Sequence, residues 1–224
     1  MGPDEIDDFK KIITDEVETV FLTSNGGAST VGFEMGKEIH KRQLKVVVDG
    51  FCFSSCANYL FLAGKEKEVL ENSFLGFHGG MSAFYDLEGE ALEAALIEEV
   101  IGQDAGALER TFALKALKKE LKMEIEFYNT IGLPEIPRLH KQLFAIYNAF
   151  EAEIEAGNVG QKKPLVGWFP PQTTFEKLGV KNITTFWHTE KKENFTKALK
   201  DYLKNEFDWE GYLFVYIEDI DQPF

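Results

Sequence analysis

The chain has 224 residues, of which 44% are hydrophobic and 13% aromatic, a composition that excludes a disordered protein and predicts a packed globular fold. Its 24 Lys and Arg stand against 38 Asp and Glu, and the formal charge of -14 argues against nucleic acid as a partner, because phosphate binding needs clustered cations. No apolar run approaches the roughly 20 residues that cross a bilayer. Residues Met1 to Asp4 also lack the basic and apolar segments of a signal peptide, so neither feature is expected in this sequence.

The first third of the chain alternates between strand and helix patterns. Apolar residues at helical spacing predict helices over 5–13, 30–40 and 57–63, and β-rich runs predict strands over 17–23, 44–49 and 73–78. Glycine turns follow the first strand at Gly26-Gly27 and the third at Gly79-Gly80. Strands joined by helical crossovers form right-handed βαβ units, so a parallel sheet is expected.

The rest of the chain has a different character. Its Ala, Leu, Glu and Lys content predicts long helices over 87–127 and a further helix over 136–156, followed by a loop over 157–171. The tail predicts helices over 174–178 and 193–205 and strands over 183–188 and 212–217. The expected organisation is an α/β fold with a core in 1–86, a helical region in 87–156 and a small α+β C-terminal part in 157–224 that completes the domain.

Distinctive residues stand at the ends of the three predicted strands of the core. Gly26-Gly27 follows the first strand, Ser54-Ser55 the second, and His78 ends the third. The carboxyl ends of parallel strands gather at one edge of a sheet, so these residues are expected to converge there. Enzymes that catalyse acyl transfer use a serine as nucleophile, a histidine beside it as base, and backbone N–H groups that stabilise the oxyanion. Glycine suits the turn because a side chain would obstruct the approach of a substrate carbonyl.

These residues resemble those of the Clp protease proteolytic subunit and its crotonase-fold relatives over about 17–80. Thr23-Ser24-Asn25-Gly26-Gly27 stands where that family has Asn-Ser-Pro-Gly-Gly, and Asn72 to His78 matches its Asn-Ser-x-x-x-x-His strand. The helix from Ser55 is similar to the family's nucleophile helix, Ser-Met-Gly-Ala-Phe-Leu-Leu. Closest are Clp-like bacterial proteins, often predicted to be periplasmic, with a Cys-x-Ser-x-Cys segment before the helix and Gly-Phe-His after it.

The resemblance implies a role for each matched residue. Ser55 would be the nucleophile, His78 the general base, and the N–H groups of Gly27 and Cys56 the oxyanion hole, with no cofactor. Ser54 is a rival nucleophile: alignment on the two cysteines favours Ser54, whereas alignment on the helix favours Ser55, and the helix is preferred because it sets the side-chain direction. The family's aspartate has no counterpart, since residues 167–171 contain no acid.

The leading hypothesis is therefore a serine hydrolase of Clp-like fold, most simply a peptidase of the periplasm or cell envelope that acts on a peptide or protein substrate. The alternative is a non-catalytic crotonase-fold module that binds a peptide or an envelope partner, and acyl-CoA chemistry ranks last. The helical region over 87–127 is expected to cover the site or to form a homo-oligomer contact.

The cysteine and histidine patterns bear on metals. Cys52 and Cys56 are too few for a cysteine-only zinc site, and they are expected either as small buried apolar residues or as a local disulfide. His40, His140 and His188 show no ligand spacing with carboxylates or cysteines, so no metal site is predicted.

Overall fold

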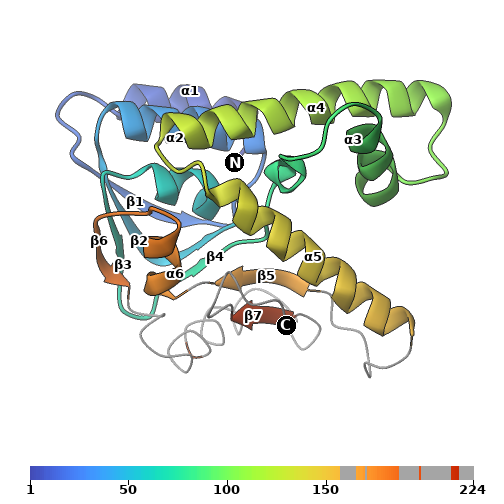
Figure 1. Ribbon diagram of the computed structural model, residues 1–224. Helices are drawn as coiled ribbons and strands as arrows, with labels where there is room; N and C mark the ends of the chain where they lie inside the picture. The colour runs from blue at the N-terminus through green and yellow to red at the C-terminus, as the bar shows by residue number, and fades with distance from the viewer. Residues whose placement is uncertain (157–164, 170, 187–196, 198–212, 217–224) are drawn as a thin grey trace.

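The computed structural model describes residues 1–156, 165–169, 171–186, 197 and 213–216, and these form an α/β fold around a parallel sheet (Figure 1). In chain order the first elements are helix α1 (Pro3–Ile12), strand β1 (Thr19–Ser24), helix α2 (Ser29–Lys41), strand β2 (Lys45–Phe53), π-helix η1 (Cys56–Phe61), and strands β3 (Glu66–Val69) and β4 (Phe74–Gly76). The 3-10 helix η2 (Met81–Phe84), helix α3 (Gly89–Leu96), π-helix η3 (Ile97–Ile101) and the long helices α4 (Ala107–Thr130) and α5 (Ile136–Glu155) follow. Strand β5 (Leu165–Phe169), helix α6 (Gln172–Lys177), and strands β6 (Ile183–Phe186) and β7 (Leu213–Tyr216) come last.

The main sheet has the order β1-β2-β3-β6, with β4 paired to β2, and every pair in it is parallel. Strand β2 is buried through Val46, Val47 and Val48, the continuous apolar pattern of an inner strand covered on both faces. Its first half pairs with β3 and its second half with β4, and Gly50, at a φ of 95°, lies between the two halves. The strand therefore passes from one neighbour to the other and carries its carboxyl end beside β4.

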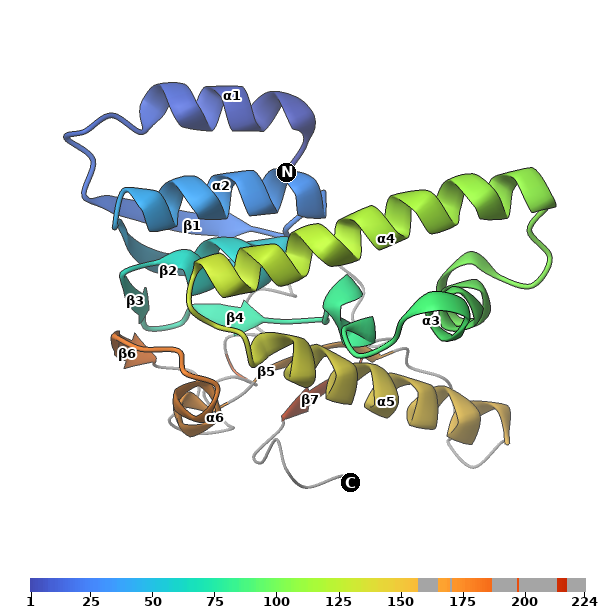
Figure 2. The ribbon, with the colours of Figure 1, turned by 45° about the horizontal axis from the view of Figure 1, so that its top comes forward.

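Helices α1, α2 and α4 lie together along one side of the sheet, and α5 crosses below α4 (Figures 1 and 2). The main core includes Phe33 of α2, Tyr59 of η1 and Phe127 of α4, whose rings contact one another with centroids 4.5 to 5.8 Å apart. A second apolar cluster lies between α3 and the middle of α4, around Leu96 and Leu121. Both clusters border the segment that leaves β4.

The prediction of an α/β fold with a parallel sheet is confirmed, whereas two details of the sequence analysis are wrong. Strand β3 was not expected, because Glu66-Lys67-Glu68-Val69 is mostly charged; it forms because it lies between two partner strands. The loop expected over 157–171 contains strand β5, which pairs in parallel with β7. Glycine and proline spacing alone did not reveal that pairing. The helix predicted over 193–205 falls almost wholly outside the described residues.

Candidate active site

The pairing of β2 with β4 brings the predicted serine and histidine segments together. Phe51, Cys52 and Phe53 lie opposite Phe74, Leu75 and Gly76, and the N–H of Ser54 donates to the Gly76 carbonyl at 3.1 Å. The chain leaves both strands at the same edge of the sheet, as expected for parallel strands. The residues that follow the two strands therefore face each other although 24 positions separate Ser54 from His78.

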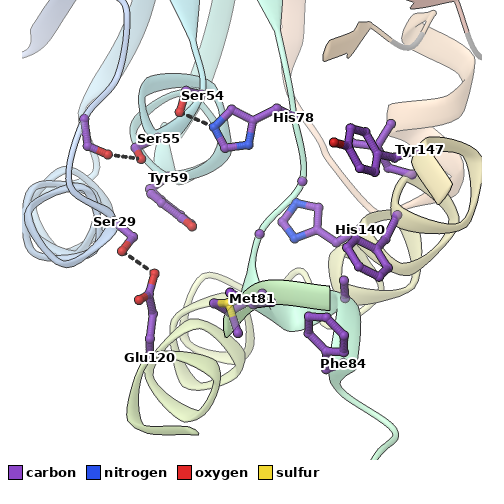
Figure 3. A pocket seen from close by; sticks show the side chains of 17 residues that line it. Ser29, Ser54, Ser55, Tyr59, His78, Met81, Phe84, Glu120, His140 and Tyr147 are labelled. Carbon is purple, nitrogen blue, oxygen red and sulfur yellow. Dashed lines mark hydrogen bonds between the residues drawn. The ribbon is translucent and has the colours of Figure 1, made fainter. Parts of the chain in front are cut away.

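Ser54 and His78 form the central contact of the site. The Ser54 hydroxyl is hydrogen-bonded to Nε2 of His78 (Figure 3). Ser54 has a φ of 60°, a left-handed conformation that is uncommon for a residue with a side chain. The ring of Phe53 packs edge-on against His78 with centroids 5.7 Å apart, so the imidazole is supported on the side of β2.

Ser55, the nucleophile favoured by the helix alignment, does not contact His78. Its hydroxyl donates to the Gly27 carbonyl at 2.7 Å, and the residue itself is buried. Ser55 has right-handed helical dihedrals at the start of η1, whereas Ser54 lies in the sharp turn before it. The turn decides which hydroxyl faces the histidine, so the pairing expected for Ser55 is corrected to Ser54.

The glycine turn lies directly against the serine turn. A Cβ atom built on Gly26 would come within 2.6 Å of the Phe53 carbonyl and 2.9 Å of the Ser55 nitrogen, so only glycine fits there. Beside it, the Met1 nitrogen donates to the Gly26 carbonyl at 2.6 Å and the N–H of Ala28 donates to the Met1 carbonyl at 3.0 Å. The turn thus makes two hydrogen bonds with Met1, one with its ammonium group and one with its carbonyl.

Cys52 and Cys56 form a disulfide across the serine turn, with Cα atoms 5.3 Å apart. Of the two alternatives for the cysteines, the structure shows the local disulfide. Both residues are fully buried, and the bridge joins the end of β2 to the first residue of η1. It encloses Phe53, Ser54 and Ser55 in a short covalent loop. Cys56 is therefore the first residue of η1, and the N–H group that directly follows Ser54 belongs to Ser55.

The serine and histidine open into a cavity of about 590 Å³. Gly27, Ser29, Ser54 and His78 line its polar end. The other wall is largely apolar and comes from η2, η3 and α5; it includes Met81, Ala83, Phe84, Val100, Leu143, Phe144 and Tyr147. In Figure 3, Tyr147 lies on the far side of the histidine from the serines, and Met81 and Phe84 lie at the lower end of the view. A molecule held at Ser54 could thus place a bulky apolar group in this space.

A buried polar cluster lies behind this wall. The Glu124 carboxylate accepts the N–H of Ser82 at 2.6 Å and the hydroxyl of Tyr59 at 2.9 Å. Nδ1 of His140 lies 2.8 Å from the Ser82 hydroxyl and 3.5 Å from the Glu124 carboxylate. The side chains of Glu124 and His140 have no exposed surface. His140 was weighed from the sequence only as a metal ligand, and this cluster was not predicted, because no local motif links α4 with η2 and α5.

The environment moves the pKa values of these groups in different directions. Burial lowers the pKa of His78 from 6.5, an effect that the backbone carbonyls of His78 and Gly79 partly oppose. Burial raises the pKa of Glu124 to about 7, against the opposing effect of its hydrogen bonds, and lowers that of His140 to about 3. His140 is therefore neutral at pH 7. Neutral His78 can accept the proton of Ser54, which is the arrangement of a general base.

No family model and no curated protein matches the chain. Among the residues that the structure describes, no three His, Cys, Asp or Glu side chains form a group that could hold a metal ion. No helix of the same part of the chain has both the length and the apolar character to cross a membrane.

Proposed function

We propose that the protein is a serine hydrolase that cleaves peptides with Ser54 as nucleophile and His78 as general base. The observation that carries this proposal is the hydrogen bond between the Ser54 hydroxyl and Nε2 of His78 at the mouth of the cavity. The resemblance to the Clp and crotonase-fold families is retained as part of the proposal, with Ser54 in place of Ser55.

The reaction needs only groups of this chain and water. Ser54 Oγ attacks the substrate carbonyl carbon while its proton passes to Nε2 of His78, and the N–H groups of Gly27 and Ser55 stabilise the oxyanion. His78 then returns the proton to the leaving amine as the C–N bond breaks. Water, deprotonated by His78, releases the acyl group and restores Ser54. With Ser54 as nucleophile, the helix-side oxyanion donor moves from Cys56 to Ser55.

Peptides are favoured over other acyl substrates by the glycine turn. The N–H of Ala28 in this turn donates to the carbonyl of Met1, and an extended peptide pairs with a free backbone edge through hydrogen bonds of this kind. The apolar wall of the cavity suits a bulky apolar side chain next to the cleaved bond.

The disulfide supports a location in the periplasm or cell envelope, because such bonds persist in oxidising compartments. Leu108 and Phe112, one turn apart on α4 and 71% and 67% exposed, support the proposed homo-oligomer contact.

A fluorophosphonate probe tests the assignment of the nucleophile. The wild-type protein should be labelled at Ser54, and Ser54→Ala should abolish labelling and lower peptidase turnover by about 10³-fold or more. Ser55→Ala should still be labelled, within about tenfold of the wild-type rate, because it loses only a hydrogen bond to the glycine turn. Mass spectrometry of the labelled peptide identifies the residue.

Two results would contradict the proposal. Labelling that survives Ser54→Ala and disappears in Ser55→Ala would return the role to Ser55. A wild-type protein that binds peptides but is not labelled would favour the binding-module alternative. That alternative is supported by the lack of a carboxylate in contact with His78 among the described residues.

A further inference from the structure

The proposed function leaves one position of a serine hydrolase unfilled. The imidazole that takes the serine proton is normally held by an acceptor on its second nitrogen, which keeps the ring in place and stabilises its positive charge. Residues 167–171, where the resemblance predicts that acceptor, contain no acid. Backbone carbonyls of His78 and Gly79 act on His78, and a further acceptor must be sought on the elements around the cavity.

His140 offers such an acceptor. Its Nε2 is buried and has no hydrogen-bond partner among the described residues, an unusual state for a buried polar atom. His140 lines the same cavity as His78. In Figure 3 the second nitrogen of His78 and a nitrogen of His140 are turned toward each other. The charge of His78 also contributes to the lowered pKa of His140, as expected for neighbouring rings.

The other side of His140 fixes which nitrogen carries its proton. Nδ1 lies 2.8 Å from the Ser82 hydroxyl and 3.5 Å from a Glu124 oxygen. A proton on Nδ1 can point at both acceptors, whereas a bare Nδ1 would place a lone pair near a carboxylate. We therefore assign the proton to Nδ1, which leaves a lone pair on Nε2. Ser82 has no exposed surface, and both contacts use one ring nitrogen, so this cluster is not a second catalytic triad.

We propose that His140, anchored by Ser82 and Glu124, is a positioning residue whose Nε2, unpartnered among the residues that the structure describes, accepts a hydrogen bond from the Nδ1–H of His78 when the imidazolium forms. This inference rests on the proposed function. As Ser54 attacks, its proton moves to Nε2 of His78, while the proton on Nδ1 stays there and points at His140. No proton passes to His140. The lone pair on Nε2 of His140, held in place by the contacts of Nδ1 with Ser82 and Glu124, stabilises the imidazolium.

Titration of His78 tests the contact without any need for activity. Histidine side-chain NMR measures the pKa of His78 in the wild type and in His140→Phe, Glu124→Gln and Ser82→Ala. Loss of the acceptor destabilises the imidazolium, so the midpoint should move to lower pH in His140→Phe. It should move less in Glu124→Gln and Ser82→Ala, which only loosen the anchoring of the His140 ring. Ser82→Ala, the smallest change, decides the matter if a larger one fails to fold.

The surroundings provide a rescue variant and a control. The other titratable groups near the two rings are Tyr59 of η1, Glu120 and Tyr128 of α4, and Tyr147 of α5. His140→Gln can place an amide oxygen near the position of Nε2 and should restore part of the midpoint shift. Tyr128→Phe removes one long hydrogen bond to Glu124, at 3.5 Å, and keeps the ring that packs edge-on against His140, so it should leave the midpoint nearly unchanged.

Labelling kinetics supply the second readout. The fluorophosphonate labelling rate should fall about 10- to 100-fold in His140→Phe, with the midpoint of its pH profile moved in the same direction as the NMR midpoint. A purely structural role would lower thermal stability and leave both midpoints in place, and that result would overturn the proposal. If the wild type is not labelled, the proposed function fails, but the NMR titration still decides the contact between the rings.

Discussion

Ser54 shows how much of the site depends on the backbone conformation of one residue. Its φ of 60° projects the hydroxyl toward His78, while the helical dihedrals of Ser55 direct that hydroxyl to Gly27. Holding a residue other than glycine in this region costs of order 1 to 3 kcal/mol and persists where neighbours enforce it. The cysteine spacing favoured Ser54 and the helix pattern Ser55, and only the turn dihedral separates the two.

At the same scale, the pKa of His78 predicts the pH dependence of labelling. Burial lowers this pKa below 6.5, and only the neutral ring accepts the Ser54 proton. Labelling should therefore be low in acid, rise with pH through a midpoint below 6.5, and stay high at pH 7. The rate of fluorophosphonate labelling between pH 4 and 8 measures the midpoint. A midpoint above 7 would show that the ring is not held as described.

The short loop between β2 and η1 is held by the disulfide and by the glycine turn beside it. Cys52 ends the run of residues that pairs with β1, and Cys56 begins η1, so the covalent bridge links two elements that flank the nucleophile. The hydrogen bond from Ser55 to Gly27 joins the same loop to the turn after β1. Strand β2, η1 and the glycine turn after β1 thus all hold residues 53–55 in place.

Removal of the disulfide should loosen this loop. For so short a loop the chain-entropy relation gives a stabilisation of about 2 kcal/mol, so Cys52→Ser/Cys56→Ser should lower the free energy of unfolding by that amount. Labelling at Ser54 should slow as well, because the turn is then less restrained. Urea unfolding and labelling rates of the double variant, each compared with the disulfide-bonded wild type, check both effects, and the reduced wild type should behave like the variant. Unchanged labelling in the double variant would show that the glycine turn alone holds the serine.

For the whole molecule, most of the helices and strands could be predicted from the sequence, because the spacing of apolar residues and the glycine turns are local signals. The same signals predicted that the carboxyl ends of three strands would lie together. The cluster of Glu124, Ser82 and His140 was beyond prediction, since those residues lie on α4, η2 and α5 and meet only through packing. Strand β3 was missed for a similar reason: its charged residues follow no strand pattern, and Lys67 is buried with its ammonium group donating to the Gly64 carbonyl.

The same buried cluster predicts how stability varies with pH. His140, with a pKa of about 3 when folded, takes up a proton near pH 6.5 when unfolded, so its contribution rises with pH between about 3 and 6.5. Glu124, with a folded pKa of about 7, releases its proton near 4.5 when unfolded, so its contribution falls between those values. The two effects oppose each other from about pH 4.5 to 6.5.

Glu124→Gln removes the falling contribution. Its melting temperature should therefore rise more steeply than that of the wild type between pH 4.5 and 6.5, as calorimetry at several pH values can show. Parallel curves for the two proteins would mean that Glu124 is ionised at all these pH values in the folded state.

The register of β2 against β4 also limits how the chain can change in length. Side chains alternate along a strand, so one inserted or deleted residue between Phe74 and His78 would turn Phe77 toward Ser54 and the imidazole away from it. Residues 70–73 lie before the paired segment, so an added residue there leaves the spacing from Phe74 to His78 unchanged. Related sequences should accordingly vary in length before Phe74 and keep a constant spacing from there to the histidine.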